Sequence, residues 1–571
     1  MRHSRVQASV IREARSRFGS AFAGQRAKVG RSLGATILAA ALDVAKPWPA
    51  ALVIDGILGK ALSDTAAVTG IVLAGAGVVL LSVLTGWLNF VATRQAAEVG
   101  RIATVRVRQQ LFDHLHRLSV PFHTASRVGD LLIRLTGDVT LIRDLLFVSW
   151  LTLIELGLSL TAMAVVMAFV DWPTALVLAV PLIHMALEGP SNASQLRAAV
   201  RKQRKRQGKS AAMAAESLTQ IRLIKAYGAE QLATGKFRAS NEREESDGLK
   251  AAVIAARIER RSETLSGLGT ALALMNGAFR VWGGALSVGE LVVLLSYAKS
   301  FFKPMRKIAS ELTRVAKASA VTERILEVLR IEPEDHTAGT PTPRLEGRIE
   351  FENVSFSYPN GRKVLTELDL MIEPGQVVAL IGGNGQGKST LLSLLLRLIE
   401  PDEGRVLVDG YPLDEFQLDS YRGRIGYVPQ GLQLFSGTLA DNIRFGRADA
   451  SDLEVAAAAR LAILDDVLAR FSEGLETEVG EGASSLSAGE ARRLMLARAA
   501  VRDADLLLLD EPFAGLDADA VPAVGRAIRA IASGRTTIVV THGQLEHLQP
   551  DMIFELSDGR LVGEVKGQLR S

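Results

Sequence analysis

Long apolar stretches fill the first half of the chain and constrain its fold more than any other feature. The hydrocarbon core of a bilayer is crossed by about 20 residues of helix. Six stretches are candidate spans: 33–57, 68–91, 145–170, 172–187, 264–282 and 286–302. Hydrophobic residues make up 48% of the 571, and the mean hydropathy of +0.20 is high for a soluble protein of this length. We therefore expect an all-α transmembrane domain with six helices.

Positive charge predicts the orientation of these spans. The connections 91–144 and 188–263 are long, rich in arginine and lysine, and helical in pattern, whereas the other connections are short and nearly free of positive charge. Positively charged loops stay on the cytoplasmic side. We expect a multi-pass protein of the bacterial inner membrane, with the lipid bilayer as a partner and both termini in the cytoplasm.

The first 31 residues form a basic lead-in. They carry Arg2, Arg5, Arg12, Arg15, Arg17, Arg26, Lys28 and Arg31. A cleaved signal peptide has a shorter basic region, and here the apolar run continues past Asp43. We therefore expect residues 1–31 to be an uncleaved cytoplasmic elbow segment, followed by a transmembrane domain at 32–330.

The composition changes after the last span. Residues 331–347 are polar and hold three prolines, which is typical of a linker. From 348 to 571, short β-branched runs alternate with helical segments, so we expect an α/β domain with a largely parallel sheet. The absence of cysteine excludes disulfides and thiolate metal sites. A net charge of +4 gives no argument for a nucleic-acid partner.

A glycine-rich loop lies between a strand, "QVVALIG", and a leucine-rich helix. It satisfies G-x-x-x-x-G-K-[ST], in which backbone N–H groups surround phosphates, Lys388 reaches the β/γ-phosphates and Ser389 ligates Mg²⁺. The helix N-terminus adds partial positive charge. The predicted ATP-binding residues here are Gly382, Gly383, Asn384, Gly385, Gln386, Gly387, Lys388, Ser389 and Thr390.

A second acidic motif follows about 120 residues later, where the apolar strand "DLLLLDEP" ends in Asp510 and Glu511. A P-loop site needs an acid at a neighbouring strand end to hold the Mg²⁺ shell, and Asp510 fits that role. Glu511 can polarise an attacking water. ATP and Mg²⁺ are thus the expected substrate and cofactor.

From Arg348 onward the chain resembles an ATP-binding cassette (ABC) nucleotide-binding domain. Five further motifs carry the resemblance: Tyr358 in "FSYP", Gln430 in "GYVPQ", the signature "LSAGE" (Leu486, Ser487, Ala488, Gly489 and Glu490), Asp517 in "AGLD" and His542 in "VVTHG". The resemblance implies that Tyr358 stacks on adenine, that Gln430 senses Mg²⁺ and that the signature binds a partner's ATP. It also implies that Asp517 forms the D-loop and that His542 contacts the γ-phosphate. Lys388, Gln430, Glu511 and His542 are the expected hydrolytic set.

The first half is similar to the membrane domain of ABC exporters. Residues 110–142 resemble its first intracellular loop, with a coupling helix near 135–139. Residues 216–230 resemble the second loop, and 286–305 the sixth span. The resemblance implies an ATP-driven half-transporter with alternating access, paired with a second copy or a homologous half-transporter. A weakly hydrolysing half of a heterodimer is the alternative; a soluble cassette ATPase is disfavoured by the six spans.

Three residues depart from the family pattern. Ala488 and Glu490 stand where the signature has glycine and glutamine, and Phe513 replaces a small hydroxyl residue. A methyl group at 488 and a carboxylate at 490 are expected to weaken ATP binding modestly. Phe513 has no explanation from the sequence.

Ionisable residues within the spans are the candidates for a substrate cavity. They are Asp43, Lys46, Glu155, His184, Arg280 and Lys299. The three cations suit an anionic or amphipathic cargo, such as a lipid or another small molecule. Lys46 and Arg280 have an equally good alternative, in which they lie at the interface and reach toward water.

Overall fold

The computed structural model describes residues 2–58, 64–126, 128–358, 361–480 and 486–566. The chain forms two compact units. The first unit contains the chain up to His116 together with Val128–Ile331. The second contains Arg117–Arg127 and the chain from Glu332 onward.

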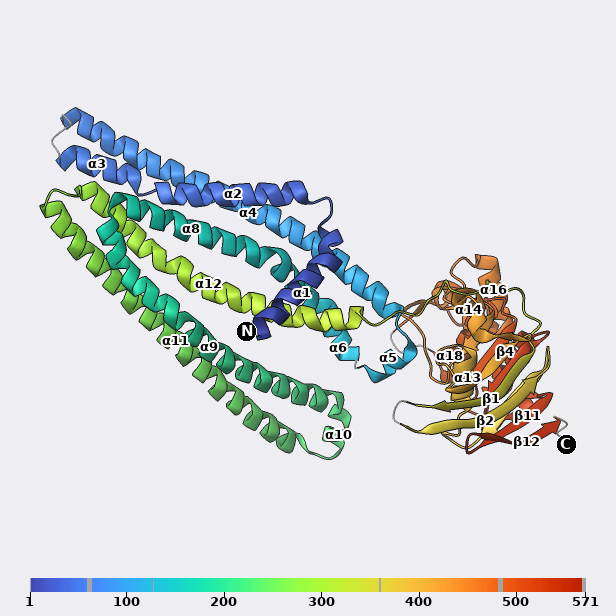
Figure 1. The fold of residues 1–571 in the computed structure, drawn as a ribbon. Coiled ribbons are helices and arrows are strands. Elements are labelled where there is room, and N and C mark those ends of the chain that lie inside the picture. The colour runs from blue at the N-terminus through green and yellow to red at the C-terminus, as the bar shows by residue number, and fades with distance from the viewer. Residues whose placement is uncertain (1, 59–63, 127, 359–360, 481–485, 567–571) are drawn as a thin grey trace. The chain divides into compact units, whose positions relative to one another are not determined.

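Long helices run side by side in the first unit (Figure 1). In chain order they are α1 (Arg2–Phe18), η1 (Gly19–Phe22), α2 (Arg26–Ala45), α3 (Trp48–Leu58), α4 (Asp64–His116), α6 (Val128–Ile133), η2 (Arg134–Asp138), α7 (Val139–Arg143), η3 (Asp144–Val148), α8 (Ser149–Val170), α9 (Trp172–Thr219), α10 (Ile221–Ala226), α11 (Glu230–Trp282) and α12 (Val288–Leu329). The segments η2 and η3 are π-helical, so the chain from α6 to α8 is one helical path with two wide turns.

All six expected spans are largely helical in this unit, although the first is broken at residues 46–47 and the sixth begins two residues before α12. Among the described residues, four helical stretches are long and apolar enough to cross a membrane: 26–57, 67–116, 128–170 and 172–219. The other two expected spans are the end of α11 and the start of α12. The α11 span contains Asn276 and Arg280, and the α12 span contains Glu290 and Lys299. Both pack in the same bundle, with α11 against α9 and α12 against α8.

The first span consists of two helices because its sequence contains prolines. Helix α2 ends at Ala45, and Pro47 precedes α3. Tyr297 on α12 is buried at this break. Its hydroxyl donates to the carbonyl of Val44 and accepts a 3.0 Å hydrogen bond from the indole of Trp48. The packing of α12 therefore secures the break between α2 and α3.

The position expected for the first coupling helix is wrong. Residues 135–139 lie within the continuous path from α6 to α7. The separate short helix of this loop is α5 (Val120–Ala125), which begins after Ser119 with Pro121 in its first turn. Helix α5 belongs to the second unit, where the carbonyl of Arg117 accepts a 2.7 Å hydrogen bond from the backbone N–H of Glu334.

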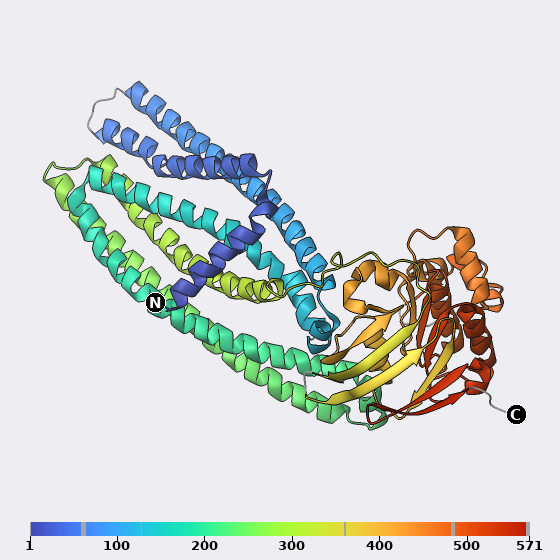
Figure 2. The same ribbon diagram turned by 45° about the vertical axis from the view of Figure 1, so that its right-hand side comes forward.

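Two principal sheets build the second unit (Figure 2). A sheet of β12-β11-β3-β10-β9-β6 is parallel except for β12, which confirms the expected parallel core. An antiparallel sheet of β2-β1-β4-β5 lies beside it. The strands are β1 (Ile349–Ser357), β2 (Lys363–Ile372), β3 (Val377–Gly382), β4 (Glu403–Val408), β5 (Tyr411–Pro412), β6 (Ile425–Val428), β7 (Gly437–Thr438), β8 (Glu478–Val479), β9 (Leu506–Asp510), β10 (Thr536–Val540), β11 (Met552–Ser557) and β12 (Arg560–Lys566).

Helices are interspersed between the strands along the chain. They are α13 (Lys388–Leu395), η4 (Leu413–Glu415), α14 (Leu418–Gly423), α15 (Leu439–Arg444), α16 (Asp452–Leu461), α17 (Asp465–Leu468), η5 (Gly474–Glu476), α18 (Ala488–Ala500), α19 (Val521–Ala532) and α20 (Leu545–Leu548). Strands β9 and β10 are buried at every position. Because parallel strands end at the same edge of a sheet, the residues after β3, β9 and β10 meet there.

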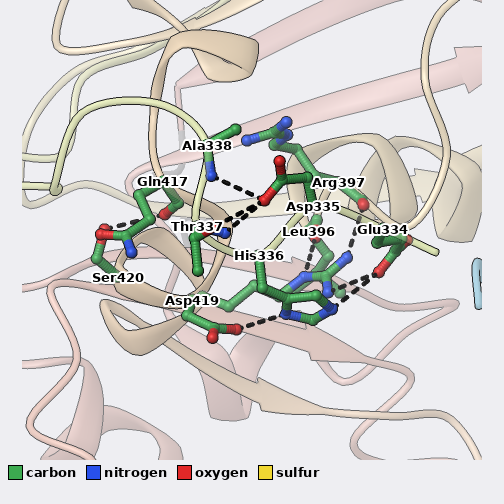
Figure 3. A network of polar contacts seen from close by, with 11 residues as sticks. Glu334, Asp335, His336, Thr337, Ala338, Leu396, Arg397, Gln417, Asp419 and Ser420 are labelled. Atoms are coloured by element: carbon green, nitrogen blue, oxygen red, sulfur yellow. Dashed lines mark hydrogen bonds and ion pairs between the residues drawn. The ribbon is translucent and has the colours of Figure 1, made fainter. Parts of the chain in front are cut away.

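The expected linker is packed against the second unit from Glu334 onward (Figure 3). His336 Nδ1 lies 2.6 Å from a carboxylate oxygen of Asp419. The guanidinium of Arg422 contacts Glu334 at 3.2 Å and donates to the carbonyls of Leu396 and Arg397. These contacts fasten the connection to the helix that follows the glycine-rich loop.

Candidate functional site

The glycine-rich loop joins β3 to α13 and depends on backbone conformations that favour glycine. Gly382, Gly385 and Gly387 have φ values of +146°, +77° and +105°. A Cβ atom on Gly387 would lie 2.7 Å from Leu365 Cδ2, so a larger residue is excluded by space as well as by conformation. The loop thus leads directly into the N-terminus of α13, where its N–H groups are available to an anion.

Lys388 lies across this loop with its side chain folded back. Its ammonium donates to the carbonyls of Gly382 and Gly383 at 2.8 and 2.9 Å, and lies 3.3 Å from His542 Nε2. Burial lowers the pKa of Lys388, while the nearby Glu511 and Asp510 carboxylates oppose that shift. A buried ammonium beside a ring of N–H groups is suited to a polyphosphate.

Asp510 ends β9 next to the first helical residues after the loop. The hydroxyl of Ser389 donates to Asp510 Oδ1 over 3.2 Å. Burial raises the pKa of Asp510, and the hydrogen bond from Ser389 lowers it. A hydroxyl and a carboxylate this close supply the oxygen ligands that Mg²⁺ prefers, so these two residues fit the metal expected from the sequence.

Glu511 follows directly and its carboxylate has two partners. Gln430 Nε2 donates a 2.7 Å hydrogen bond to Oε2, and His542 Nε2 lies 3.1 Å from Oε1. Glu511 has a φ of +48°, an uncommon backbone conformation for a residue with a side chain. Its backbone N–H is bonded to the carbonyl of Val540 at 2.9 Å, which holds this turn against β10. The carboxylate is therefore fixed in position and direction.

Tyr358 follows β1 and borders the same helix. Its hydroxyl lies 3.2 Å from Thr390 Oγ1, and its ring packs edge-on against Phe356 with centroids 5.1 Å apart. Tyr358 is 39% exposed, so its side chain is accessible to a planar ligand. The glycine-rich loop, Tyr358, Gln430, Asp510, Glu511 and His542 thus form one neighbourhood.

The signature residues begin α18 and form a separate cluster. Ser487 caps the helix by accepting from the N–H of Glu490 at 3.3 Å, and Glu490 accepts from the N–H of Ser487 at 2.9 Å. The Glu490 carboxylate also pairs with Arg470 at 2.5 Å. Burial raises the pKa of Glu490, but the hydrogen bonds from Ser487 and Arg470 outweigh it and the pKa is lowered. The carboxylate of Glu490 therefore stays ionised, and the guanidinium of Arg470 compensates its charge.

The signature is not bonded to the glycine-rich loop. Within the described residues, no hydrogen bond or ion pair joins 486–490 to 382–390. Ala488 is half-buried, while Gly489 is buried with its Cα against the D-loop region, where a Cβ would lie 2.7 Å from Ala520 Cβ. Asp517 itself is exposed. The exposed Ser487 is thus free to meet a ligand bound elsewhere.

Arg492 is a residue that the sequence analysis missed. It lies on α18 and is 2% exposed, and its guanidinium donates to the carbonyls of Pro429 and Gln430 at 2.8 and 2.9 Å. Burial lowers its pKa, against the attraction of Asp510 and Glu511. Arg492 therefore links the signature helix to the loop that carries Gln430. The sequence offered one indication of this role, because Arg492 lies within a largely apolar helical segment.

Phe513 now has a structural explanation. It is 8% exposed and lies in the apolar core that also contains Leu509, Val521 and Val524. A small hydroxyl residue there leaves space that this chain fills with a ring. The substitution thus adds packing next to the strand end that carries Asp510.

The six candidates in the membrane helices do not gather into one site. Lys46 is paired with Asp43 at 2.5 Å, and Arg280 with the buried Asp171 at 2.6 Å. His184 lies 3.5 Å from Glu188. Glu155 is half-buried on α8, and Lys299 is exposed on α12. Two of the three cations are therefore matched by carboxylates, which the sequence did not predict.

Comparison with known proteins agrees with this geometry. The family described as "ABC transporter transmembrane region" matches residues 31–305, and the family described as "ABC transporter" matches residues 365–514. The chain belongs to the ABC transporter family. Its membrane domain and nucleotide-binding domain are fused, which is the arrangement of an exporter half-transporter.

Similar proteins include several ABC exporters. An ATP-dependent lipid A-core flippase of Chromobacterium violaceum is 31% identical over 519 residues, which are 90% of this chain and 88% of that protein. An uncharacterized ABC transporter ATP-binding protein of Bacillus subtilis is 31% identical over 80% of this chain and 76% of that one. The solved structure of a bacterial Atm1-family ABC exporter with ATP bound superimposes with a TM-score of 0.84 at 27% identity, covering 95% of this chain and 96% of that one. This ABC exporter is therefore a membrane protein that hydrolyses ATP.

Proposed function

We propose that this exporter works as a homodimer that moves an amphipathic, lipid-like molecule across the bilayer. The fixed Glu511 carboxylate, held between Gln430 and His542, is the observation that carries the proposal, because it supports full hydrolysis rather than a weakly hydrolysing regulatory half. Similarity to lipid A-core flippases over most of the chain supports the cargo class.

Each residue of the site has a role in this scheme. Lys388 exchanges its two carbonyl contacts for the β- and γ-phosphates of ATP, and Tyr358 stacks on the adenine. Glu511 orients a water and accepts its proton, while His542 holds the γ-phosphate. Ser389, Asp510 and the side-chain oxygen of Gln430 hold Mg²⁺, which supplies charge stabilisation for the phosphates when bound.

The separation of the two half-sites supports the dimer. The chain has one glycine-rich loop and one signature, and the exposed Ser487 is not bonded to that loop. Ser487 of one copy therefore contacts the γ-phosphate held by Lys388 of the other. Closure around two ATP molecules and reopening after hydrolysis drive alternating access, since nucleotide binds the two states with different affinities.

The paired charges within the membrane helices favour an amphipathic cargo over a strongly anionic one. Lys46 and Arg280 are paired with Asp43 and Asp171, so carboxylates compensate two of the three candidate cations. This weakens the charge argument for an anionic cargo and favours recognition of an apolar body.

Hydrolysis by the chain alone, in lipid nanodiscs, is the first test. We expect Mg²⁺-dependent turnover that Glu511→Gln nearly abolishes while ATP still binds. Retained turnover in this variant would remove Glu511 from its role. If the chain hydrolyses ATP as expected, candidate lipids are ranked by how strongly each stimulates turnover. Absent turnover in the well-folded unmodified chain would favour the heterodimer.

Mixing two inactive variants tests the homodimer directly. Each proposed ATP site combines Lys388 of one copy with Ser487 of the other. A homodimer of Lys388→Ala chains, or of Ser487→Arg chains, therefore has two defective sites. A mixed dimer keeps one site intact, so we expect co-expression to restore part of the hydrolysis. Both substitutions in one chain provide the control and should restore nothing. Failure of the mixed dimers would contradict shared sites.

A further inference from the structure

The N-terminal helix α1 is fastened to the helical unit by an apolar stripe. Val10, Ala14 and Phe18 recur every fourth residue and are 2%, 0% and 1% exposed. Glu13 forms an ion pair with Arg330 at 2.6 Å. The opposite face carries exposed basic residues. Helix α1 is therefore an amphipathic segment with a defined seat on the bundle.

Two connected cavities open beside this helix. The first has a volume of about 390 Å³ and the second about 440 Å³. The first is lined by Arg15, Gly19, Val29, Leu33, Leu146, Phe147, Trp150, Leu151 and Ile154, and the second by Gly19, Ala23, Arg26, Val29 and Gly30. Because they share Gly19 and Val29, they form one groove between α1, α2 and α8, here called the elbow groove.

The elbow groove is apolar within and basic at its rim. All its charged lining residues are arginines, Arg15 and Arg26, and both are exposed. Neither forms an ion pair with any residue that the structure describes. The nearby Lys28, in contrast, forms an ion pair with Glu98 at 2.8 Å. The rim thus offers two uncompensated positive charges to an anion.

The position of the elbow groove limits what can occupy it. On α2, Arg26, Lys28 and Arg31 precede the apolar stretch that begins at Leu33. On α8, Trp150 and Ile154 are 39% and 45% exposed at the start of an apolar span. Basic residues followed by apolar ones mark the boundary between headgroups and acyl chains. The molecule available at that boundary with an anionic end and an apolar body is a phospholipid.

We propose that the elbow groove binds one anionic phospholipid of the surrounding bilayer. Its phosphate lies on Arg15 and Arg26, and an acyl chain lies along Leu33, Trp150 and Ile154. This site goes beyond the proposed transport activity, because its lipid is a resident of the membrane and not the cargo. Binding therefore requires neither ATP nor hydrolysis.

Quenching of tryptophan by brominated lipid tests the proposal in the full chain. The chain is placed in phosphatidylcholine nanodiscs without ATP, with a small fraction of brominated phosphatidylglycerol or, separately, brominated phosphatidylcholine. Trp150 is isolated as the difference from Trp150→Phe. We expect phosphatidylglycerol to quench Trp150 preferentially, by about five-fold for each arginine near the surface.

Two sets of variants test the charge at the rim of the elbow groove and the space within it separately. Arg15→Gln with Arg26→Gln should reduce quenching by phosphatidylglycerol to the level of phosphatidylcholine. Gly19→Leu, where a Cβ meets nothing within 4 Å, should fill the groove and lower quenching by both lipids. Arg201→Gln with Arg204→Gln removes the same charge from exposed positions of α9 and should retain the preference.

Two results would overturn the site. One is equal quenching of Trp150 by the two lipids in the unmodified chain. The other is a preference that survives both the arginine and the Gly19→Leu variants. Loss of the preference on adding ATP would instead identify the lipid as passing cargo, which also contradicts a resident lipid. Glu511→Gln, which blocks turnover, should leave the quenching unchanged.

Discussion

Gln430 Nε2 donates a 2.7 Å hydrogen bond to Oε2 of Glu511. This contact joins a loop that follows β6 to the residue that follows β9. It also leaves the side-chain oxygen of Gln430 available for a cation, so one side chain can sense the metal and the carboxylate together. Because Arg492 holds the backbone of the same loop, movement of the signature helix can reach Glu511 through Gln430.

Gln430→Ala is expected to lower hydrolysis by about 10-fold or more, the usual cost of removing a partner that orients a site ligand. ATP binding should change little, because Lys388 and the glycine-rich loop are intact. Hydrolysis rates and nucleotide affinity in nanodiscs provide the measurement. Gln433→Ala, an exposed glutamine in the same loop, is the matched control and should have normal activity. An unchanged rate in Gln430→Ala would show that Glu511 is held without it.

The Arg470–Glu490 pair predicts how the altered signature tolerates its carboxylate. Arg470→Ala should raise the KM for ATP a few-fold by uncovering the charge of Glu490. The effect is small because Arg470 is 55% exposed, and exposed pairs contribute about 0.2–1 kcal/mol. Glu490→Gln keeps an acceptor for the N–H of Ser487 but has no charge.

A double-mutant cycle isolates this effect. In the Glu490→Gln background, Arg470→Ala should leave the KM nearly unchanged, because no carboxylate remains to be uncovered. Equal effects of Arg470→Ala in both backgrounds would mean that Arg470 acts on ATP directly or on the fold.

Phe513→Ala should destabilise the chain by about 3–5 kcal/mol, the range for removing a buried ring. Phe513→Leu keeps most of the volume and should cost less than about 1.5 kcal/mol. Thermal unfolding in detergent gives the order of the variants, and hydrolysis per folded molecule should be retained by Phe513→Leu. A Phe513→Ala variant as stable as the parent would mean that the core closes around the gap.

Local motifs made the nucleotide site predictable from sequence, while the membrane helices were predictable only in outline. The residues from Gly382 to Thr390 are contiguous, and the backbone of the strand, loop and helix brings Asp510 and His542 to the same sheet edge.

Three features were not predicted correctly from the sequence. One depends on where a helix is interrupted, and the other two depend on contacts between residues far apart in the chain. The coupling helix was misplaced because helical periodicity continues through 135–139, while the separate helix α5 begins at Val120 with Pro121 in its first turn. Asp171 and Arg280 are 109 positions apart in the sequence, so no local sequence pattern predicts their ion pair. Arg492 likewise finds its partners more than 60 residues away.

The Asp171–Arg280 pair predicts that one of the suspected cargo residues is structural. Asp171 is almost fully buried, caps α9 through the N–H of Thr174, and accepts from Arg280 on α11. Breaking a fully buried pair from one side costs about 3–5 kcal/mol, because it leaves a charge unpaired. A smaller cost is expected here, because Arg280 is 32% exposed and Asp171 keeps its hydrogen bonds from Thr174. Arg280→Gln should therefore reduce thermal stability in detergent.

Removing both charges provides the decisive comparison. Asp171→Asn with Arg280→Gln should recover much of the stability lost in Arg280→Gln, since no buried charge is left alone. Lys299→Gln, at an exposed position of α12, is the matched control and should unfold at the parent temperature. A cargo role for Arg280 would appear differently: Arg280→Gln would keep its stability but lose stimulation of ATP hydrolysis by lipid, and the double variant would not regain it.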